Sequence, residues 1–124
     1  MSPETTRSVG QRGEDEAARH LEAQGLRLLE RNYRCRGGEI DLVMREGNTL
    51  VLVEVRLRAS AEFGGAAASV GPRKQRRFIL AARHLLMMRP EFRSLAVRFD
   101  VVALDGGAAG VAKIDWIRDA FRAG

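Results

Sequence analysis

The sequence predicts an α/β fold in which a mixed β-sheet is covered by helices. Two segments have apolar residues at helical spacing, and several others are rich in β-branched and apolar residues at strand spacing. The resulting order is α-β-β-β-α-β-β, which suits one sheet with helices packed against it. At 124 residues the chain is long enough for a single domain, 1–124, with a core of modest size. The predicted helices are 6–24 and 72–88, and the predicted strands are 26–33, 39–45, 49–57, 95–104 and 113–117.

The chain starts with residues 1–5, which we expect to be disordered. The first helix is predicted over 6–24, and Gly25 follows it as a residue type that favours the left-handed conformation after a helix. Glu14 lies on the apolar face of this helix, one turn before Ala18. An inward glutamate can be a metal ligand, or it can cap the helix or form an ion pair.

The first strand, 26–33, leads into a basic stretch around an aromatic residue. Arg31, Arg34 and Arg36 surround Tyr33. Such residues can grip a sugar-phosphate backbone, or they can form a solvated sheet edge. The residues alone leave both interpretations open.

A β-hairpin is predicted next, with arms at 39–45 and 49–57. Gly47 and Asn48 lie between the arms, and both residue types tolerate the positive φ that tight hairpin turns need. With these two as the turn, Glu46 faces the first residue of the second arm. This register sets every other pair in the hairpin.

In that register Asp41 lies opposite Glu54, and Glu39 lies opposite Arg56, with all four side chains on one face. Two carboxylates that face each other across a ladder repel, so a cation between them is favoured. A hard divalent ion such as Mg²⁺ or Mn²⁺ prefers oxygen ligands. The alternative is a solvated sheet surface in which Glu39 and Arg56 form an ordinary ion pair.

Residues 59–70 are rich in Ala, Gly and Ser and predict a mobile loop, which can close over a substrate or simply connect two elements.

Pro72 then opens the second helix. Cations at the start of a helix oppose its dipole, which suggests an anionic partner such as phosphate; a solvated cluster is the alternative. The cations in the first turns are Arg73, Lys74, Arg76 and Arg77.

The strand at 95–104 places Arg98 and Asp100 on one face, where we interpret them as a structural pair. A short last strand is predicted at 113–117. In the tail that follows, Phe121 is expected to pack back onto the domain.

Composition favours a nucleic-acid partner weakly. The formal net charge is +5, and Lys74 and Lys113 are the only lysines. Arginine suits phosphate because its planar fork binds two oxygens, although a coding bias toward arginine is an alternative explanation.

A single cysteine excludes an intrachain disulfide and a cysteine-based zinc cluster. With no signal peptide and no apolar run of roughly 20 residues, we expect a cytoplasmic protein without membrane contact.

Gly38-Glu39-Ile40-Asp41-Leu42, followed by Val53-Glu54-Val55-Arg56, resembles the core motif of the PD-(D/E)XK nuclease-like superfamily. More narrowly, the chain resembles the small bacterial YraN-type family, which is similar to archaeal Holliday-junction resolvases. The resemblance covers nearly the whole chain. It also includes Gly10-x-x-Gly13-Glu14, Arg31-Asn32-Tyr33-Arg34, Phe63-Gly64, Lys74 and Arg98-Phe99-Asp100-Val101-Val102.

This resemblance implies a restriction-endonuclease-like domain that hydrolyses phosphodiesters with Mg²⁺ or Mn²⁺. DNA is the expected substrate in preference to RNA, with branched or junction DNA as a candidate, and a junction would favour a two-fold homodimer. The implied metal ligands are Asp41, Glu54 and Glu14, and the implied catalytic residues are these three and Arg56. The expected nucleic-acid contacts are Arg34, Arg73, Lys74 and Arg77.

The chain departs from the superfamily motif at Arg56, where lysine is common. Arginine can contact phosphate but cannot act as a general base, because its pKa exceeds about 12. Lys74 could supply an amine from the second helix instead. The rival prediction is a non-catalytic nucleic-acid-binding module of a DNA-processing complex, and a third is a structural domain with solvated carboxylates.

Overall fold

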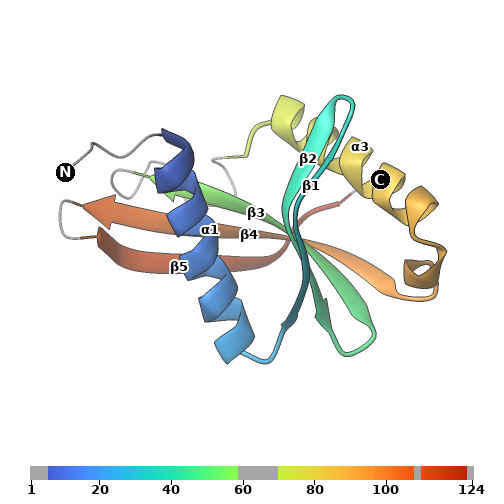
Figure 1. Cartoon of the computed structure of the whole chain (residues 1–124), viewed down its shortest axis with the longest axis horizontal. Coiled ribbons are helices and arrows are strands. Elements are labelled where there is room, and N and C mark those ends of the chain that lie inside the picture. The colour runs from blue at the N-terminus through green and yellow to red at the C-terminus, as the bar shows by residue number, and fades with distance from the viewer. Residues whose placement is uncertain (1–5, 59–69, 108–109, 123–124) are drawn as a thin grey trace.

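A computed structural model describes residues 6–58, 70–107 and 110–122 of the chain. Its centre is a five-stranded sheet in which the strands lie side by side in sequence order, as Figure 1 shows. This confirms the predicted mixed α/β architecture. Residues 1–5 and 59–69, predicted as a disordered start and a mobile loop, lie outside the described residues. The elements are α1 (Thr6–Ala23), β1 (Arg27–Cys35), β2 (Gly38–Glu46), β3 (Thr49–Arg58), α3 (Pro72–Met88), the 3-10 helix η1 (Pro90–Phe92), β4 (Ala96–Gly107) and β5 (Gly110–Phe121).

The sheet is mixed because one of its strand pairs is parallel. β1, β2 and β3 form an antiparallel meander, β4 and β5 form an antiparallel pair, and β3 pairs with β4 in parallel. Parallel neighbours need a crossover connection, and α3 lies within it. No helix in the described part of the chain is long and apolar enough to cross a membrane.

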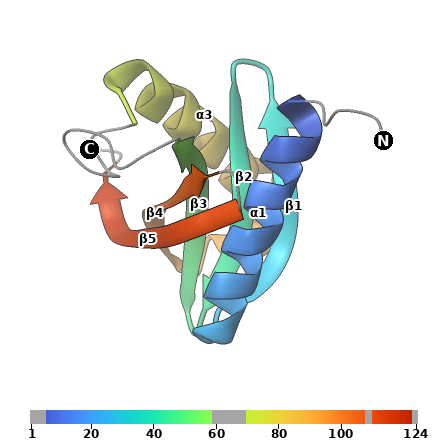
Figure 2. The ribbon, with the colours of Figure 1, turned by 90° about the vertical axis from the view of Figure 1, so that its left-hand side faces the viewer.

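The two helices cover opposite faces of the sheet. Side chains of a strand alternate between faces. Val51 and Val53 of β3 pack in the core cluster that includes α1, whereas Leu50 and Leu52 pack in the cluster that includes α3. Figure 2 shows α1 in front of β1 and β2, with α3 on the other side of the sheet.

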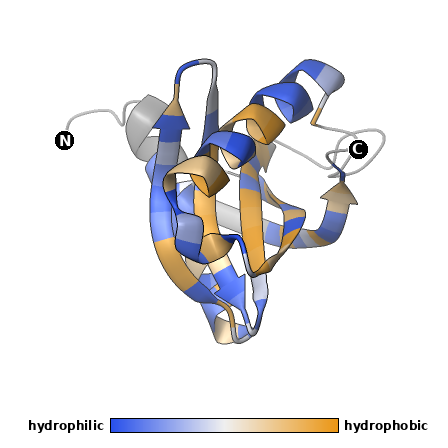
Figure 3. Cartoon of the chain, turned by 90° about the vertical axis from the view of Figure 1, so that its right-hand side faces the viewer, coloured by the Kyte–Doolittle hydropathy of each residue, from blue (hydrophilic) through white to orange (hydrophobic). Residues whose placement is uncertain are grey.

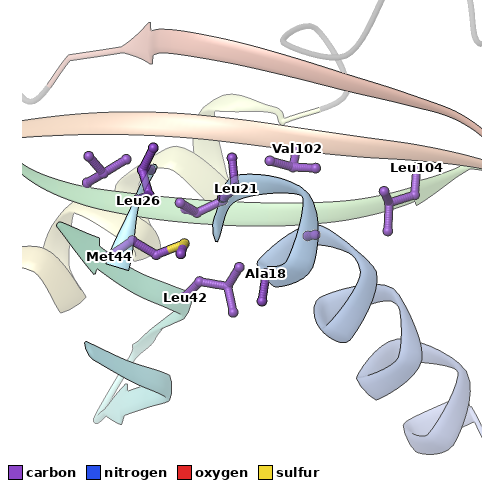
Figure 4. Packing of buried hydrophobic residues seen from close by; sticks show 10 residues of the cluster. Ala18, Leu21, Leu26, Leu42, Met44, Val102 and Leu104 are labelled. Carbon is purple, nitrogen blue, oxygen red and sulfur yellow. The ribbon is translucent and has the colours of Figure 1, made fainter. Parts of the chain in front are cut away.

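The core on the α1 side depends on how that helix ends. Gly25 has a φ of +100°, which the chain needs to turn back after the helix. The N–H of Leu26 donates to the carbonyl of Leu21 at 3.1 Å, and the N–H of Gly25 donates to that of Glu22 at 3.0 Å. These two bonds form the Schellman arrangement at the C-terminus of the helix. Figure 4 shows Ala18 and Leu21 packed near Leu42, with Leu26, Met44, Val102 and Leu104 around them.

The core on the α3 side follows the predicted apolar stripe. Figure 3 shows that hydrophobic and hydrophilic residues alternate along α3. The helix lies so close to β2 that a Cβ added at Gly38 would be 2.2 Å from the backbone carbonyl oxygen of Arg77. Only glycine therefore allows this approach. The buried residues of α3 are Phe78, Ala81, Ala82 and Leu85.

The last strand is longer than predicted. β5 extends to Phe121 instead of ending at residue 117, because its pairing with β4 continues to Phe99. Phe121 therefore belongs to the sheet. Its ring centroid lies 5.3 Å from that of Phe99 and 5.6 Å from that of Phe78, so it packs on the core as expected.

The fully buried Asp100 holds β4 to β5. Its carboxylate accepts hydrogen bonds from Arg98 Nε at 2.9 Å and from Arg98 Nη2 at 3.0 Å. It also accepts bonds at 2.9 Å from Trp116 Nε1 and from the backbone N–H of Asp119. The predicted structural role of the Arg98–Asp100 pair is therefore confirmed.

Candidate functional site

The predicted hairpin register is confirmed where β2 and β3 are paired. Partners run from Glu46 opposite Thr49 to Leu42 opposite Val53, and the ladder ends there. Only Gly47 of the two turn residues has a positive φ, of +58°. The register therefore leads Asp41 and Glu54 to the point where the two strands separate.

Beyond the end of the ladder, a hydrogen bond to a side chain links the two strands. Oδ2 of Asp41 accepts a hydrogen bond of 2.8 Å from the backbone N–H of Val55. The strand is also irregular here, because Ile40 packs in the cluster on the α3 side whereas Leu42 packs in the cluster on the α1 side. Residues two apart in a regular strand would share a face. Asp41 thus lies where β2 bends, and Figure 1 shows the β1–β2 hairpin rising between α1 and α3.

The Asp41 and Glu54 carboxyl groups interact electrostatically. Burial raises the pKa of Asp41 to about 8, and the nearby Glu54 carboxylate adds to this effect, while the Val55 hydrogen bond opposes it. Glu54 is 4% exposed. At neutral pH Asp41 therefore holds its proton for most of the time.

Glu14 approaches this pair from α1. A Cβ added at Gly13 would lie 2.9 Å from a methyl group of Leu57, so glycine at this position lets α1 come close to the end of β3. Burial raises the pKa of Glu14, whereas a hydrogen bond with Asn32 lowers it. Glu14 in turn helps to raise the pKa of Asp41. Among the described residues, Oε1 of Glu14 is buried without a hydrogen-bond partner.

Lys74 reaches the same carboxylates from the first turns of α3. Its Nζ lies 3.0 Å from Oε1 of Glu54, and the two side chains are 47% and 5% exposed. A small cavity of about 40 Å³ lies beside this ion pair. Its lining residues are Glu39, Glu54, Lys74, Arg77 and Phe78.

The ion pair between Glu39 and Arg56, which the sequence offered as the alternative to a metal site, is not the pair that Glu39 forms. The β1–β2 ladder places Arg34 directly opposite Glu39, and Arg34 Nε donates to the Glu39 carboxylate at 3.2 Å. Arg56 is half-buried on β3, and its Nε has no hydrogen-bond partner within the described ranges. The motif indicates that Arg56 lies near the end of β3. The hairpin alone could not show that Glu39 pairs with Arg34 instead of Arg56.

Sequence reasoning missed the role of Asn32. Its side chain hydrogen-bonds Glu14, and its φ is +52°. Asparagine is one of the few residue types that adopt this conformation readily. An asparagine inside a basic strand was therefore a usable signal for an irregular backbone at this position.

The donor set suits a hard divalent cation, although it is not a ready-made metal site. No three His, Cys, Asp or Glu side chains within 6–58, 70–107 and 110–122 are gathered closely enough to hold a metal. However, Asp41 and Glu54 are close enough for the Glu54 carboxylate to raise the pKa of Asp41, and among the described residues Glu14 has a buried oxygen with no hydrogen-bond partner. Such oxygens are the ligands that Mg²⁺ and Mn²⁺ prefer.

The structure brings together four of the predicted site residues from four elements. Glu14 comes from α1, Asp41 from β2, Glu54 from β3 and Lys74 from α3. Around them, the remaining predicted nucleic-acid contacts, Arg34, Arg73 and Arg77, have exposed side chains.

Comparison with known proteins places the chain in a family. The model of the "Uncharacterised protein family UPF0102" matches residues 13–104, a range that includes the carboxylates and the lysine described above. A UPF0102 protein of Herminiimonas arsenicoxydans is 54% identical over 120 residues, which cover 96% of this chain and 91% of the relative. One from Dechloromonas aromatica is 50% identical, with 97% and 93% covered, and one from Ralstonia pickettii is 54% identical, with 94% and 91% covered. The chain belongs to the UPF0102 family.

Proposed function

We propose that this protein is an endonuclease that hydrolyses phosphodiesters in DNA with the help of Mg²⁺ or Mn²⁺, and that branched or junction DNA is its substrate. The observation that carries this proposal is the pair of half-buried Asp41 and buried Glu54 at the end of the hairpin ladder. A carboxyl group whose pKa is raised by burial and by a neighbouring carboxylate gains most from a cation that the two groups share. The resemblance to the PD-(D/E)XK superfamily gives the same pair the same role.

The residues that would hold the cation come from three elements. Asp41 and Glu54 supply carboxylates, Glu14 supplies its unpartnered oxygen, and Val55 can supply its backbone carbonyl. When bound, the ion would supply positive charge that promotes attack by water and stabilises the negative charge that develops on the phosphate.

The basic residues have different tasks. Lys74 places an ammonium group beside Glu54, where it can contact the phosphate of a substrate. Arg56 can bind phosphate through its planar fork, but it cannot accept a proton from water. Arg34, Arg73 and Arg77 lie on the surface around the site and suit contacts to the sugar-phosphate backbone, which position DNA without reading its sequence.

The second candidate is a non-catalytic nucleic-acid-binding module that works inside a DNA-processing complex. The specific observation in its favour is Arg56, which stands where the superfamily motif commonly has lysine. The basic surface supports binding in both proposals, so only cleavage separates them.

The test is cleavage of labelled branched, duplex and single-stranded DNA in the presence of Mg²⁺ or Mn²⁺. Wild type and Asp41→Asn would be compared, with Glu91→Gln as the matched control, because Glu91 is an exposed carboxylate on η1. We expect cutting by wild type and Glu91→Gln, and none by Asp41→Asn or after chelation of the metal. DNA binding without cutting by any of the three would favour the binding module, and absence of binding would contradict both proposals. Sedimentation with and without junction DNA would show whether a two-fold dimer forms.

A further inference from the structure

We infer that Lys74 is a displaceable counter-ion of the carboxylate site: it pairs with Glu54 in the metal-free protein and leaves that carboxylate when a divalent cation binds, which frees its ammonium group for the substrate phosphate. This inference rests on the proposed function. It adds an order of events at the same site, because the lysine becomes available only after metal loading.

The first step in the argument is that Glu54 needs a cation. Its side chain is 5% exposed, and an ionised carboxylate buried to this degree is costly unless it is paired. Its neighbour Asp41 is a second carboxyl group, so it supplies no positive charge to Glu54. Lys74, with Nζ 3.0 Å from Oε1 of Glu54, therefore provides the neutralising charge in this structure.

The second step is that Lys74 is able to leave. About half of its side chain is exposed, at 47%, and a lysine carries its charge on a flexible stem of four carbons. Its ammonium can therefore move into water at little cost, whereas the Glu54 carboxylate is fixed in the sheet. A divalent cation and an ammonium group on one carboxylate repel each other, so binding of the first weakens the contact of the second.

The third step is where the released ammonium can go. The first turn of α3 contains no acidic residue that could capture it. Glu39 lines the adjacent cavity, but Arg34 already pairs with it at 3.2 Å. Arg77 lines the same cavity, so the local potential there favours an incoming anion. The remaining partner is the phosphate of a substrate, which an ammonium group binds well.

The first experiment measures Mn²⁺ affinity by calorimetry in wild type, Lys74→Met and Arg73→Met. Arg73 is the matched control, because it is an exposed cation in the same helical turn. We expect Lys74→Met to bind Mn²⁺ about ten-fold more tightly than wild type, and Arg73→Met to differ far less, because its charge is screened by solvent. Equal or weaker binding by folded Lys74→Met would overturn the inference.

A second measurement needs no substitution in the site, and it covers the case in which Lys74→Met fails to fold. The chain has only two lysines, Lys74 and Lys113, so protein labelled at the lysine ε-carbons gives two side-chain signals by NMR. Nζ of Lys113 lies 3.7 Å from Oδ1 of Asp115 on β5, so the Lys113 signal serves as an internal reference. The variant Lys113→Arg shows which signal belongs to which lysine. We expect Mg²⁺ to move the Lys74 signal toward that of a solvated lysine and to leave the Lys113 signal in place.

The outcomes separate this inference from the proposed function. If calorimetry shows metal binding but the Lys74 signal does not move, the inference fails and the metal site stands. If wild type, Lys74→Met and Arg73→Met all fail to bind Mn²⁺, the metal site of the proposed function fails, and the inference fails with it.

Discussion

The buried Asp100 and the half-buried Asp41 show how the partners of a side chain decide its role. Asp100 accepts four hydrogen bonds, from Arg98, Trp116 and the backbone of Asp119, so its charge is fully compensated. Asp41 accepts a single bond from a backbone N–H, and its other close neighbours are carboxylates. The hydrogen bonds of Asp100 stabilise the sheet, whereas the contacts of Asp41 do not compensate a negative charge on its carboxylate.

The first prediction concerns stability against pH in the absence of metal. The pKa of Asp41 is raised from its ordinary value of 3.8 to about 8 in the folded protein, chiefly by burial and by Glu54. The folded state therefore keeps a proton that the unfolded chain has lost, and its contribution to the free energy of unfolding declines as pH rises from about 4 to about 8. Urea unfolding in chelator at several pH values should show this decline in wild type and its loss in Asp41→Asn. Identical pH profiles in the two proteins would contradict the assignment.

The second prediction concerns metal affinity against pH. A carboxylate must lose its proton before it can bind a cation, so Mn²⁺ binding should release about one proton at neutral pH. The apparent Kd should therefore fall about ten-fold for each pH unit up to about 8 and level off above it. Calorimetry in buffers of different ionisation enthalpy counts the released protons. A Kd that is constant across this range would show that Asp41 does not exchange its proton for the metal.

Two elements form the walls of the site, and each depends on a glycine. Gly13 lets α1 approach the end of β3, and Gly38 lets α3 lie directly on β2. The second contact is the tighter one, because the neighbouring atom is the backbone oxygen of Arg77, which cannot move without the helix. The position of Lys74, one turn before Arg77, is therefore set by a residue of β2.

The third prediction follows from this contact. Gly38→Ala should displace α3 and lower the free energy of unfolding by about 1–3 kcal/mol, because overpacked cores cost this much. It should also weaken the Lys74–Glu54 contact. Gly71→Ala is the matched control, since a Cβ at Gly71 meets no atom within 4 Å and its φ is −72°. Chemical denaturation measures both variants, and equal stabilities would show that the helix adapts without cost.

How far the site could be predicted differs between its elements. The register of β2 and β3 could be predicted because a tight turn and alternating side chains determine it locally. The bend at Asp41, the Glu39–Arg34 pair and the contact of Lys74 could not, because they depend on β1 and α3, which pack against the hairpin from distant parts of the sequence. The length of β5 was underestimated for a related reason, since β4 and the bonds of Asp100 hold its polar end in the sheet.

At the scale of the whole molecule, the fold places positive charge around the carboxylate site. The net charge is +5, and exposed arginines surround a site made from buried and half-buried carboxylates. The acids would repel DNA if they stood alone, whereas the surrounding cations attract it. This arrangement suits a ligand that is held at its phosphates and is placed over a small anionic centre.

The fourth prediction concerns the salt dependence of DNA binding. If about six phosphates are contacted, the affinity should fall about a thousand-fold between 50 and 200 mM salt. Arg73→Gln should weaken binding to all sequences alike and reduce the slope of log K against log salt by about one. Fluorescence anisotropy with labelled DNA measures both effects, and an affinity independent of salt would contradict a phosphate-binding surface.

The parallel pairing of β3 with β4 has a consequence for the order of folding. The strands β1, β2 and β3 are joined by short turns, so their contacts are local and close rapidly. β4 can pair with β3 only when the ends of the long segment between Arg58 and Ala96 come together, and this closure costs entropy before any contact offsets it. We therefore expect a nucleus in the N-terminal meander and late docking of the β4–β5 hairpin. Trp116, the only tryptophan, has its indole N–H bonded to Asp100 of β4, so its fluorescence gives stopped-flow kinetics a probe of the late-forming half of the sheet.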